Sequence, residues 1–215
     1  MPSSNSVAPI DSPKSVCQVY LIEDDADLRG QLAATLSDNG LCVREFGSAE
    51  DFLQSGVDHT PAVIVSDMVL PGLSGIRLFE TIRASGIQTP LIFISGYSEP
   101  NQIIDGMKLG AVDFLWKPFK SDALLKVVMQ SLVNDMQRQV QSAEQRNVQM
   151  RWDSLTEREQ EVCKCMLRGY GNKDIAAQLG IQSDTANKHR MKVLKKMGVS
   201  GRPDLIDLLK GFITD

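Results

Sequence analysis

The sequence contains several short apolar runs that each end at a polar or charged residue. One of them covers 62–66 and is followed directly by Asp67. Near-continuous apolar runs of this length are typical of strands buried on both faces, as in a parallel sheet. In such a sheet the functional groups gather at the carboxyl ends of the strands. We therefore expect one pocket formed by the residues that close these runs: Glu23, Asp24, Asp67, Ser95 and Lys117.

Helical patterns alternate with the apolar runs. Apolar side chains recur three and four residues apart in four segments, at 27–36, 48–53, 75–82 and 102–110. With a further strand expected at 41–46 and a fifth helix expected after residue 120, the apolar runs and these segments give five strand–helix units in about 130 residues. We expect a flavodoxin-like α/β fold with a five-stranded parallel sheet of order 2-1-3-4-5.

Charge is distributed unevenly along the 215 residues. Residues 1–150 carry 11 Lys and Arg against 18 Asp and Glu, whereas residues 151–215 carry 12 against 9. A chain of this length favours two domains. An acidic half joined to a mildly basic half fits an input module tied to a nucleic-acid binder.

The domain limits follow from composition and pattern. We expect a disordered tail at 1–15, an α/β domain at 16–130, a linker helix at 131–151 and a small all-α domain of four helices at 152–215. The linker is expected to be helical because neither Gly nor Pro interrupts 120–150.

Several classes of protein are disfavoured by composition. The amino terminus lacks the apolar core of a signal peptide, and no stretch approaches the roughly 18 apolar residues of a membrane helix. We expect a cytoplasmic protein with no membrane association. The four cysteines match neither a disulfide framework nor a zinc pattern, so Cys163 and Cys165 are interpreted as small core or half-buried residues.

Residues from about 17 to 130 resemble the receiver domain of two-component response regulators, which take a phosphoryl group from a sensor histidine kinase. The acid pair Glu23-Asp24, the lone Asp67, the hydroxyl of Ser95 and the sequence Lys117-Pro118-Phe119 carry the resemblance. In receivers this Lys–Pro bond is usually cis, and cis bonds are mostly confined to such X–Pro steps.

The resemblance implies a role for each matched residue. Asp67 is the expected phosphorylation site. Ser95 and Lys117 are expected to bind phosphoryl oxygens, and Phe114 is expected to be the switch aromatic that swings inward when the hydroxyl moves. A divalent cation, Mg²⁺ or Mn²⁺, is expected to be held by three carboxylates and a backbone carbonyl: Glu23, Asp24, Asp67 and Val69.

Enzymatic alternatives have less support. Haloacid dehalogenase phosphatases also place a nucleophilic Asp after a parallel strand, but they need a second Asp two residues later, where this chain has Val69. The phosphate-binding loop of nucleotide hydrolases is also missing. We expect no enzyme beyond self-phosphorylation with the metal and slow self-dephosphorylation. A phosphorylation-independent DNA-binding protein with a structural receiver stays open.

The linker helix carries a short repeat. Positions 133, 136, 140, 143, 147 and 150 step by three and four, as a heptad seam with one Asn would. Two interpretations stay open here: a dimerising seam, or a solvated helix whose first turns pack on the sheet.

The carboxy-terminal segment has the pattern of a helix-turn-helix unit. Thr156 and Glu159 form a capping-box sequence that opens a helix ending near Gly169. Further helices are expected from Asn172 to about 179, over 183–197 and over 203–212. A basic helix after a tight turn is typical of DNA-binding motifs of this kind.

Residues 152–213 resemble the LuxR-type DNA-binding domain of NarL/FixJ response regulators. The carriers span four helices and include Leu155-Thr156, Arg158-Glu159, Gly169, Asn172-Lys173, Ile175-Ala176, Leu179, Ile181, Thr185, His189, Lys196-Met197-Gly198-Val199 and Arg202. Two positions depart from the family pattern. Gln182 stands where Ser or Thr is usual, and Ala186 replaces Val.

In the expected recognition helix, the inward face comprises Ala186, Val193, Leu194 and Met197. The outward residues match family positions that touch base edges: Asn187 suits adenine, Lys188 suits guanine and Met191 offers apolar contact to thymine. The residues expected to hold phosphates are Asn172, Lys173, Thr185, His189, Lys192 and Lys195, although His189 could equally be half-buried core.

Together these patterns predict a response regulator in which phosphorylation of Asp67 alters DNA binding or oligomeric state and so regulates transcription. The expected partners are a cognate sensor histidine kinase, double-stranded promoter DNA, a second copy of the chain when phosphorylated, and RNA polymerase.

Overall fold

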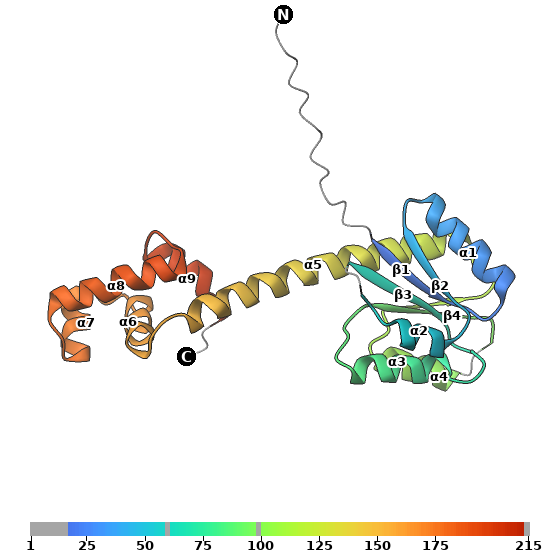
Figure 1. The fold of residues 1–215 in the computed structure, drawn as a ribbon, viewed down its shortest axis with the longest axis horizontal. Coiled ribbons are helices and arrows are strands. Elements are labelled where there is room, and N and C mark those ends of the chain that lie inside the picture. Colours follow the sequence, from blue (N-terminus) through green and yellow to red (C-terminus); the bar gives the residue numbers. More distant parts are fainter. Residues whose placement is uncertain (1–16, 59–60, 98–99, 213–215) are drawn as a thin grey trace, which may run out of the picture. The chain divides into compact units, whose positions relative to one another are not determined.

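The computed structural model describes residues 17–58, 61–97 and 100–212. The expected disordered tail therefore lies outside the described residues. The described chain falls into two compact units divided after Gln139, and each is considered by itself (Figure 1).

The described part of the first unit contains a five-stranded, fully parallel sheet. The strand order is β2-β1-β3-β4-β5, which confirms the predicted flavodoxin-like topology. The second strand begins one residue later than predicted. The strands are β1 (Gln18–Ile22), β2 (Cys42–Phe46), β3 (Ala62–Asp67), β4 (Leu91–Ser95) and β5 (Asp113–Trp116).

Helices cover both faces of the sheet (Figure 1). Alternate side chains of a strand point to opposite faces, so Tyr20 and Ile22 pack on one side while Val19 and Leu21 pack on the other. The first face is covered by α2 (Ala49–Ser55), α3 (Gly75–Ala84) and α4 (Pro100–Lys108), and the second by α1 (Ala26–Asp38) and α5 (Ser121–Asp153). Because β1, β3 and β4 are buried on both faces, their sequences are almost continuously apolar.

The strand register brings the predicted pocket residues to one edge. Ile22 pairs with Ser66, and Asp67 pairs with Ile94, so the residues after β1 and at the end of β3 are neighbours. The amide of Lys117 donates to the carbonyl of Ser95 at 2.8 Å, which places the end of β5 beside the end of β4.

Helix α5 runs without interruption from Ser121 to Asp153, as the absence of breakers predicts. The α/β domain was expected to end at residue 130. Buried side chains of α5 continue beyond that residue, since Ser131, Leu132 and Asp135 are all buried. The apolar members of the proposed seam are exposed, among them Val133 and Val140. Whether a partner covers this seam stays a prediction.

The second unit contains α6 (Glu157–Leu167), α7 (Asn172–Leu179), α8 (Ser183–Met197) and α9 (Arg202–Leu209). The predicted capping box is present: the Glu159 amide donates to the Thr156 hydroxyl, and the Thr156 amide donates to the Glu159 carboxylate. The last helix ends at Leu209, earlier than predicted. The core is formed by side chains from all four helices, including Val162, Ile175, Ala186, Val193, Met197 and Leu205.

The inward face predicted for α8 is confirmed, since Ala186, Val193 and Met197 are buried and Leu194 is half-buried. Gln182 is the N-cap residue of α8, but its side chain makes no capping hydrogen bond. Both Cys163 and Cys165 are buried, and burial raises the pKa of the Cys163 thiol to about 11. Among the described helices, none is long and apolar enough to cross a membrane.

Candidate functional sites

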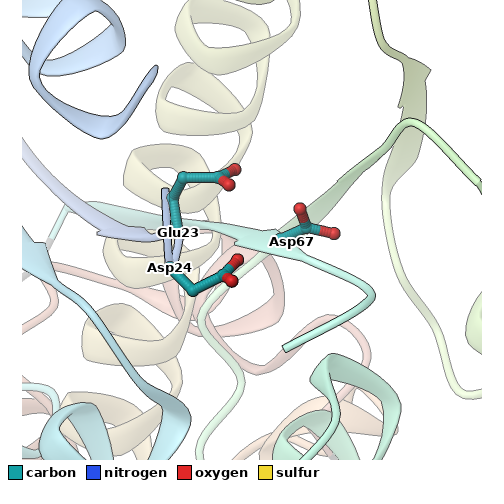
Figure 2. A group of neighbouring side chains, drawn as sticks. All are labelled: Glu23, Asp24 and Asp67. Atoms are coloured by element: carbon teal, nitrogen blue, oxygen red, sulfur yellow. The ribbon is translucent and has the colours of Figure 1, made fainter. Parts of the chain in front are cut away.

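Three carboxylates converge at the carboxyl edge of the sheet. Glu23 and Asp24 follow β1, Asp67 ends β3, and Figure 2 shows the first two side chains extending toward Asp67. One oxygen of each lies within 4.8 Å of those of the other two. Glu23 and Asp67 are buried, at 1% and 6% exposed, whereas Asp24 is exposed. The cluster is therefore embedded on one side and open to solvent on the other.

Lys117 lies directly against this cluster. Its Nζ donates to Glu23 Oε2 at 2.6 Å and to Asp67 Oδ2 at 2.5 Å. The following peptide bond, to Pro118, is cis, as the family signature predicts. The sequence predicted that these groups would meet at one edge, and here the ammonium bridges two of the three carboxylates.

The ionisation of the pocket follows from burial and these contacts. Burial raises the pKa of Glu23, and repulsion from Asp67 adds to this, while the hydrogen bond from Lys117 opposes it. Burial alone would lower the pKa of Lys117, but its hydrogen bonds to Asp67 and Glu23 outweigh this and raise it. The ammonium is thus held in its charged form, and it offsets part of the negative charge around it.

Backbone contacts fix the two acidic segments. The amide of Val69 donates to Asp67 Oδ1 at 2.8 Å, which brings the backbone of Val69 next to the acidic cluster. Arg29 Nη1 donates to the carbonyl of Glu23 at 2.6 Å, and Asp25 caps α1 by accepting from the amides of the first turn. Arg29 was not predicted as part of the site. Its place in the first turns of the helix after the acid pair is the signal that could have found it.

Ser95 and Phe114 lie on β4 and β5. The Ser95 hydroxyl is buried and donates to the carbonyl of Tyr97 at 2.9 Å. Phe114 is half-buried, packs against the core on the α3 and α4 side, and meets Trp116 edge-to-face with ring centroids 4.9 Å apart. The Trp116 side chain is itself half exposed.

The donor set fits a hard divalent cation. Mg²⁺ and Mn²⁺ prefer oxygen ligands, and this cluster offers three carboxylates with a backbone segment beside them. Clustered carboxylates repel one another, so a cation held between them would relieve that repulsion. The residues present therefore suit the ion that the sequence predicted.

The second candidate site is the outer surface of α8 and the start of α7. The predicted base-contacting residues Asn187, Lys188 and Met191 are exposed on α8. The predicted phosphate-contacting residues divide into two groups: Lys173, Lys192 and Lys195 are exposed, whereas Asn172, Thr185 and His189 are half-buried. The open alternative for His189 has support, because its Nδ1 is buried and has no hydrogen-bond partner among the described residues.

Hydrogen bonds join two of the predicted residues to one that was not predicted. Arg190 Nη1 donates to Asn172 Oδ1 at 2.5 Å, and Asn172 Nδ2 donates to Asn187 Oδ1 at 3.3 Å. The polar face of α8 is thereby tied to the first residue of α7. Arg190 was missed because its sequence neighbours give no indication of which helix it would reach.

Comparisons with known proteins match both halves of the chain. Residues 19–129 match the response regulator receiver domain, and residues 153–209 match the bacterial regulatory proteins of the luxR family. The chain is 36% identical over 188 residues to the transcriptional regulatory protein FixJ of Azorhizobium caulinodans, covering 87% of this chain and 89% of that one. It is 37% identical to nodulation protein W of Bradyrhizobium diazoefficiens, again covering 87% of this chain and 83% of the relative.

Solved structures agree with this assignment. A low-resolution structure of the response regulator StyR superposes with a TM-score of 0.86 at 33% identity, covering 91% of this chain and 99% of that one. Full-length FixJ from B. japonicum gives a TM-score of 0.56 at 31% identity, covering 92% and 98%. The chain therefore belongs to the FixJ/NarL-type response regulators, two-component transcription regulators in which a receiver domain precedes a LuxR-type DNA-binding domain.

Proposed function

We propose that Asp67 accepts the phosphoryl group from a cognate sensor histidine kinase. The observation that carries the proposal is the convergence of Glu23, Asp24 and Lys117 on Asp67 at the end of β3. In the reaction a carboxylate oxygen of Asp67 attacks phosphorus, the P–N bond to the kinase histidine breaks, and an acyl phosphate forms. Phosphoryl transfer depends on positioning and charge neutralisation, which these neighbours supply.

A Mg²⁺ or Mn²⁺ ion would be held by Glu23, Asp24, Asp67 and the backbone carbonyl of Val69. When bound, the ion neutralises charge on the phosphoryl oxygens. The chain contributes the remaining positive charge through Lys117, which already contacts Asp67 Oδ2. After transfer, Lys117 pairs with a phosphoryl oxygen in place of that carboxylate oxygen.

The switch proceeds through Ser95 and Phe114. The Ser95 hydroxyl donates to the Tyr97 carbonyl in the unmodified chain, so donation to a phosphoryl oxygen requires it to leave that partner. Its movement makes room for the half-buried Phe114 to turn inward, away from Trp116. The added charge, about −1.5 to −2, supplies the attraction that drives the change.

The phosphoacceptor can be tested by incubating the full chain with acetyl phosphate and Mg²⁺ and then measuring its intact mass. Asp67→Asn keeps the shape but removes the nucleophile, so we expect the wild type to gain one phosphoryl group and this variant none. Asp25→Asn is the matched control, because Asp25 lies in the same acidic segment but caps α1, where Asn is an equally good cap. Phosphate on the Asp67→Asn chain would show that the assignment is wrong.

The output is sequence-specific binding of double-stranded promoter DNA, with α8 in the major groove. Asn187, Lys188 and Met191 face base edges, while Thr185, His189, Lys192, Asn172 and Lys173 hold the backbone. In this setting RNA polymerase is a further partner. The alternative is a DNA-binding protein that does not depend on phosphorylation. Equal DNA affinities of the phosphorylated wild type, the unmodified wild type and Asp67→Asn would identify it.

Phosphorylation acts by pairing two receivers. Four apolar side chains on α4, on β5 and in the loop between them are exposed, and exposing them gives a monomeric receiver no stability: Ile104, Met107, Val112 and Trp116. A symmetric dimer through this face would bring two DNA-binding domains to adjacent half-sites. The proposed face is the last helix–strand–helix segment of the receiver, about residues 99–130, of which Glu99 lies outside the described residues.

Sedimentation velocity of the unmodified and phosphorylated chain tests this pairing. We expect a monomer before phosphorylation and a dimer after it. Met107→Glu should abolish the dimer, whereas Gln31→Glu, which adds the same charge to the exposed surface of α1, should not. A chain that is monomeric in both states, yet binds DNA more tightly when phosphorylated, would reject dimerisation and indicate release of an inhibitory contact.

A further inference from the structure

The three carboxylates of the acidic cluster are held in different ways. Glu23 and Asp67 both accept from Lys117, and Asp67 also accepts from the amide of Val69. The Asp24 side chain is exposed, and its carboxylate has no hydrogen-bond partner among the described residues. The position of this third carboxylate therefore depends on its rotamer and on the backbone that carries it.

Arg29 holds that backbone. Its Nη1 donates to the carbonyl of Glu23 at 2.6 Å and lies 3.5 Å from the carbonyl of Asp24. The Glu23 carbonyl belongs to the peptide group that joins Glu23 to Asp24, so the contact acts on the link between two of the carboxylates. The amide of Glu23 donates to the Phe46 carbonyl at 3.1 Å. Both polar groups of the Glu23 backbone are thereby tied to neighbouring residues.

The guanidinium is itself fixed in place. Arg29 lies in the first turn of α1, its side chain is 21% exposed, and its Nε is 3.8 Å from Glu45 Oε2 near the end of β2. Asp25 caps the same helix by accepting from the amides of Asp27 and Leu28. A guanidinium stays charged and carries only donors, so it suits the carbonyl oxygens that it meets here. The acidic segment is therefore held between the helix that follows it and the neighbouring strand.

We infer that Arg29 is a positioning residue that sets the affinity of the acidic cluster for a divalent cation, by holding the Asp24 side chain beside the other two carboxylates. The inference rests on the proposed function of this cluster as the cation site. Groups that orient metal ligands without touching the metal commonly change the metal affinity by about 10–100-fold when they are removed. Arg29 is of this kind, because it contacts the backbone of the expected ligands.

The sign of the effect separates positioning from two simpler roles. A positive charge near the cluster repels a cation, so if Arg29 acted by its charge alone, removing it would tighten metal binding. If Arg29 served only the stability of the fold, removing it would lower the free energy of unfolding and leave the metal affinity of the folded chain unchanged. Loss of positioning instead predicts weaker binding, because the ion would then have to order the acidic segment as it binds.

Titration of the full-length chain with Mn²⁺, followed by the electron paramagnetic resonance signal of the free ion, measures this affinity without phosphorylation. We expect Arg29→Met, which keeps an apolar stem but has no donor, to raise the dissociation constant for Mn²⁺ about tenfold. Arg29→Lys should recover part of this loss, because its ammonium can donate to the Glu23 carbonyl. The matched control is Arg44→Met on β2, which should leave the affinity unchanged because Arg44 donates to Asp58 and Ser55.

Two results would overturn the inference alone. An unchanged Mn²⁺ affinity of Arg29→Met would assign the residue to the stability of the fold, and a tighter affinity would assign it to charge repulsion. If circular dichroism shows that Arg29→Met does not fold, Arg29→Lys decides, and an affinity equal to that of the wild type would count against positioning. A wild-type chain that binds no Mn²⁺, or binds it no better than Asp24→Asn does, would refute the proposed cation site and the inference with it.

Discussion

The buried ion pair between Glu159 and Lys196 is predicted to stabilise the DNA-binding domain. Glu159 is 3% exposed, and its Oε2 accepts from Lys196 Nζ at 2.6 Å and from the Thr156 amide at 3.0 Å. Glu159→Gln keeps the size and one acceptor but removes the charge. A hydrogen bond to a charged group contributes about 1.5–3 kcal/mol. Lys196 stays bonded to the Ser154 carbonyl at 2.8 Å and is partly exposed, so it is not left as a stranded buried charge.

We therefore expect Glu159→Gln to lower the free energy of unfolding of this domain by about 1.5–3 kcal/mol. The assay is urea unfolding of the full-length chain in a Trp116→Phe background, which leaves Trp152 as the sole tryptophan. Trp152 packs edge-on against Phe212 at 6.0 Å, within the second unit, so its fluorescence reports that unit. With a slope of about 1–2 kcal/mol per molar urea, the midpoint should fall by about 1 M or more.

A matched control lies on the same helix. Glu161 pairs with Arg158 at 2.6 Å, but half of its side chain is exposed. Solvent screening limits such surface pairs to about 0–1 kcal/mol, so Glu161→Gln should barely move the midpoint. Equal losses for the two variants would refute the argument that burial makes the Glu159 pair the stronger one.

The same pair predicts a pH dependence with a definite sign. The hydrogen bond from Lys196, which outweighs the opposing effect of burial, holds the pKa of Glu159 below its ordinary value of 4.5. A carboxylate with a depressed folded-state pKa stabilises fully above the unfolded value, and this contribution is lost as the pH falls through the folded value. The difference between wild type and Glu159→Gln should thus be constant near neutrality and shrink below about pH 4.5. A difference that persists unchanged at lower pH would contradict this ionic origin.

Three further predictions concern the receiver and the recognition helix. Gly75→Ala should destabilise the receiver by at least the 1–3 kcal/mol typical of overpacking, measured by urea unfolding, because its Cβ would lie 2.3 Å from the backbone oxygen of Asp67. Val69→Glu should shorten the lifetime of the phosphorylated state, measured as the intact mass over time, because the exposed apolar side chain of Val69 cannot orient an attacking water whereas a carboxylate can. An unchanged or longer lifetime would count against water positioning by residue 69. Lys188→Ala should cost about 1–3 kcal/mol of binding free energy on the cognate DNA site alone. Lys195→Ala should weaken binding to all sequences alike and lower the slope of log affinity against log salt concentration by about 0.9. Identical losses for the two variants on cognate and random DNA would remove the distinction between base and backbone contact.

The sheet could be predicted from sequence because its central strands are buried on both faces. Short runs as continuously apolar as β3 and β4 are typical of strands covered by helices on either side, and the polar residue that ends each run marks the carboxyl edge. Helix ends were less certain. α9 ends at Leu209 although Lys210 and Phe212 continue a helical pattern, because the chain leaves the helix with Lys210 in an extended conformation.

The members of the candidate sites could be expected from residue type and order, but their pairings could not. Lys117 reaches both Glu23 and Asp67, and Arg29 reaches the Glu23 carbonyl. Long, flexible side chains of this kind have many rotamers, and the tertiary contacts select one. The hydrogen bond from Asn172 to Asn187 is a similar case, since its direction depends on a third residue on another turn of helix.

The extent of the receiver along α5 shows the same limit at a larger scale. The absence of Gly and Pro predicts one continuous helix but not where its packing on the sheet ends. Asp135 reads in sequence as a solvated helical residue, yet it is 2% exposed, and its Oδ2 accepts from the amide of Ala62 at 3.1 Å. Arg138 pairs with Asp135 and donates to the Gln88 carbonyl, which fastens the next turn to the start of β4. A buried carboxylate is tolerated here because it satisfies a backbone N–H at the first residue of β3 and pairs with an arginine. Helix α5 therefore contacts the amino end of the strand whose carboxyl end carries Asp67, and its packing on the receiver continues past residue 131 as far as Arg138.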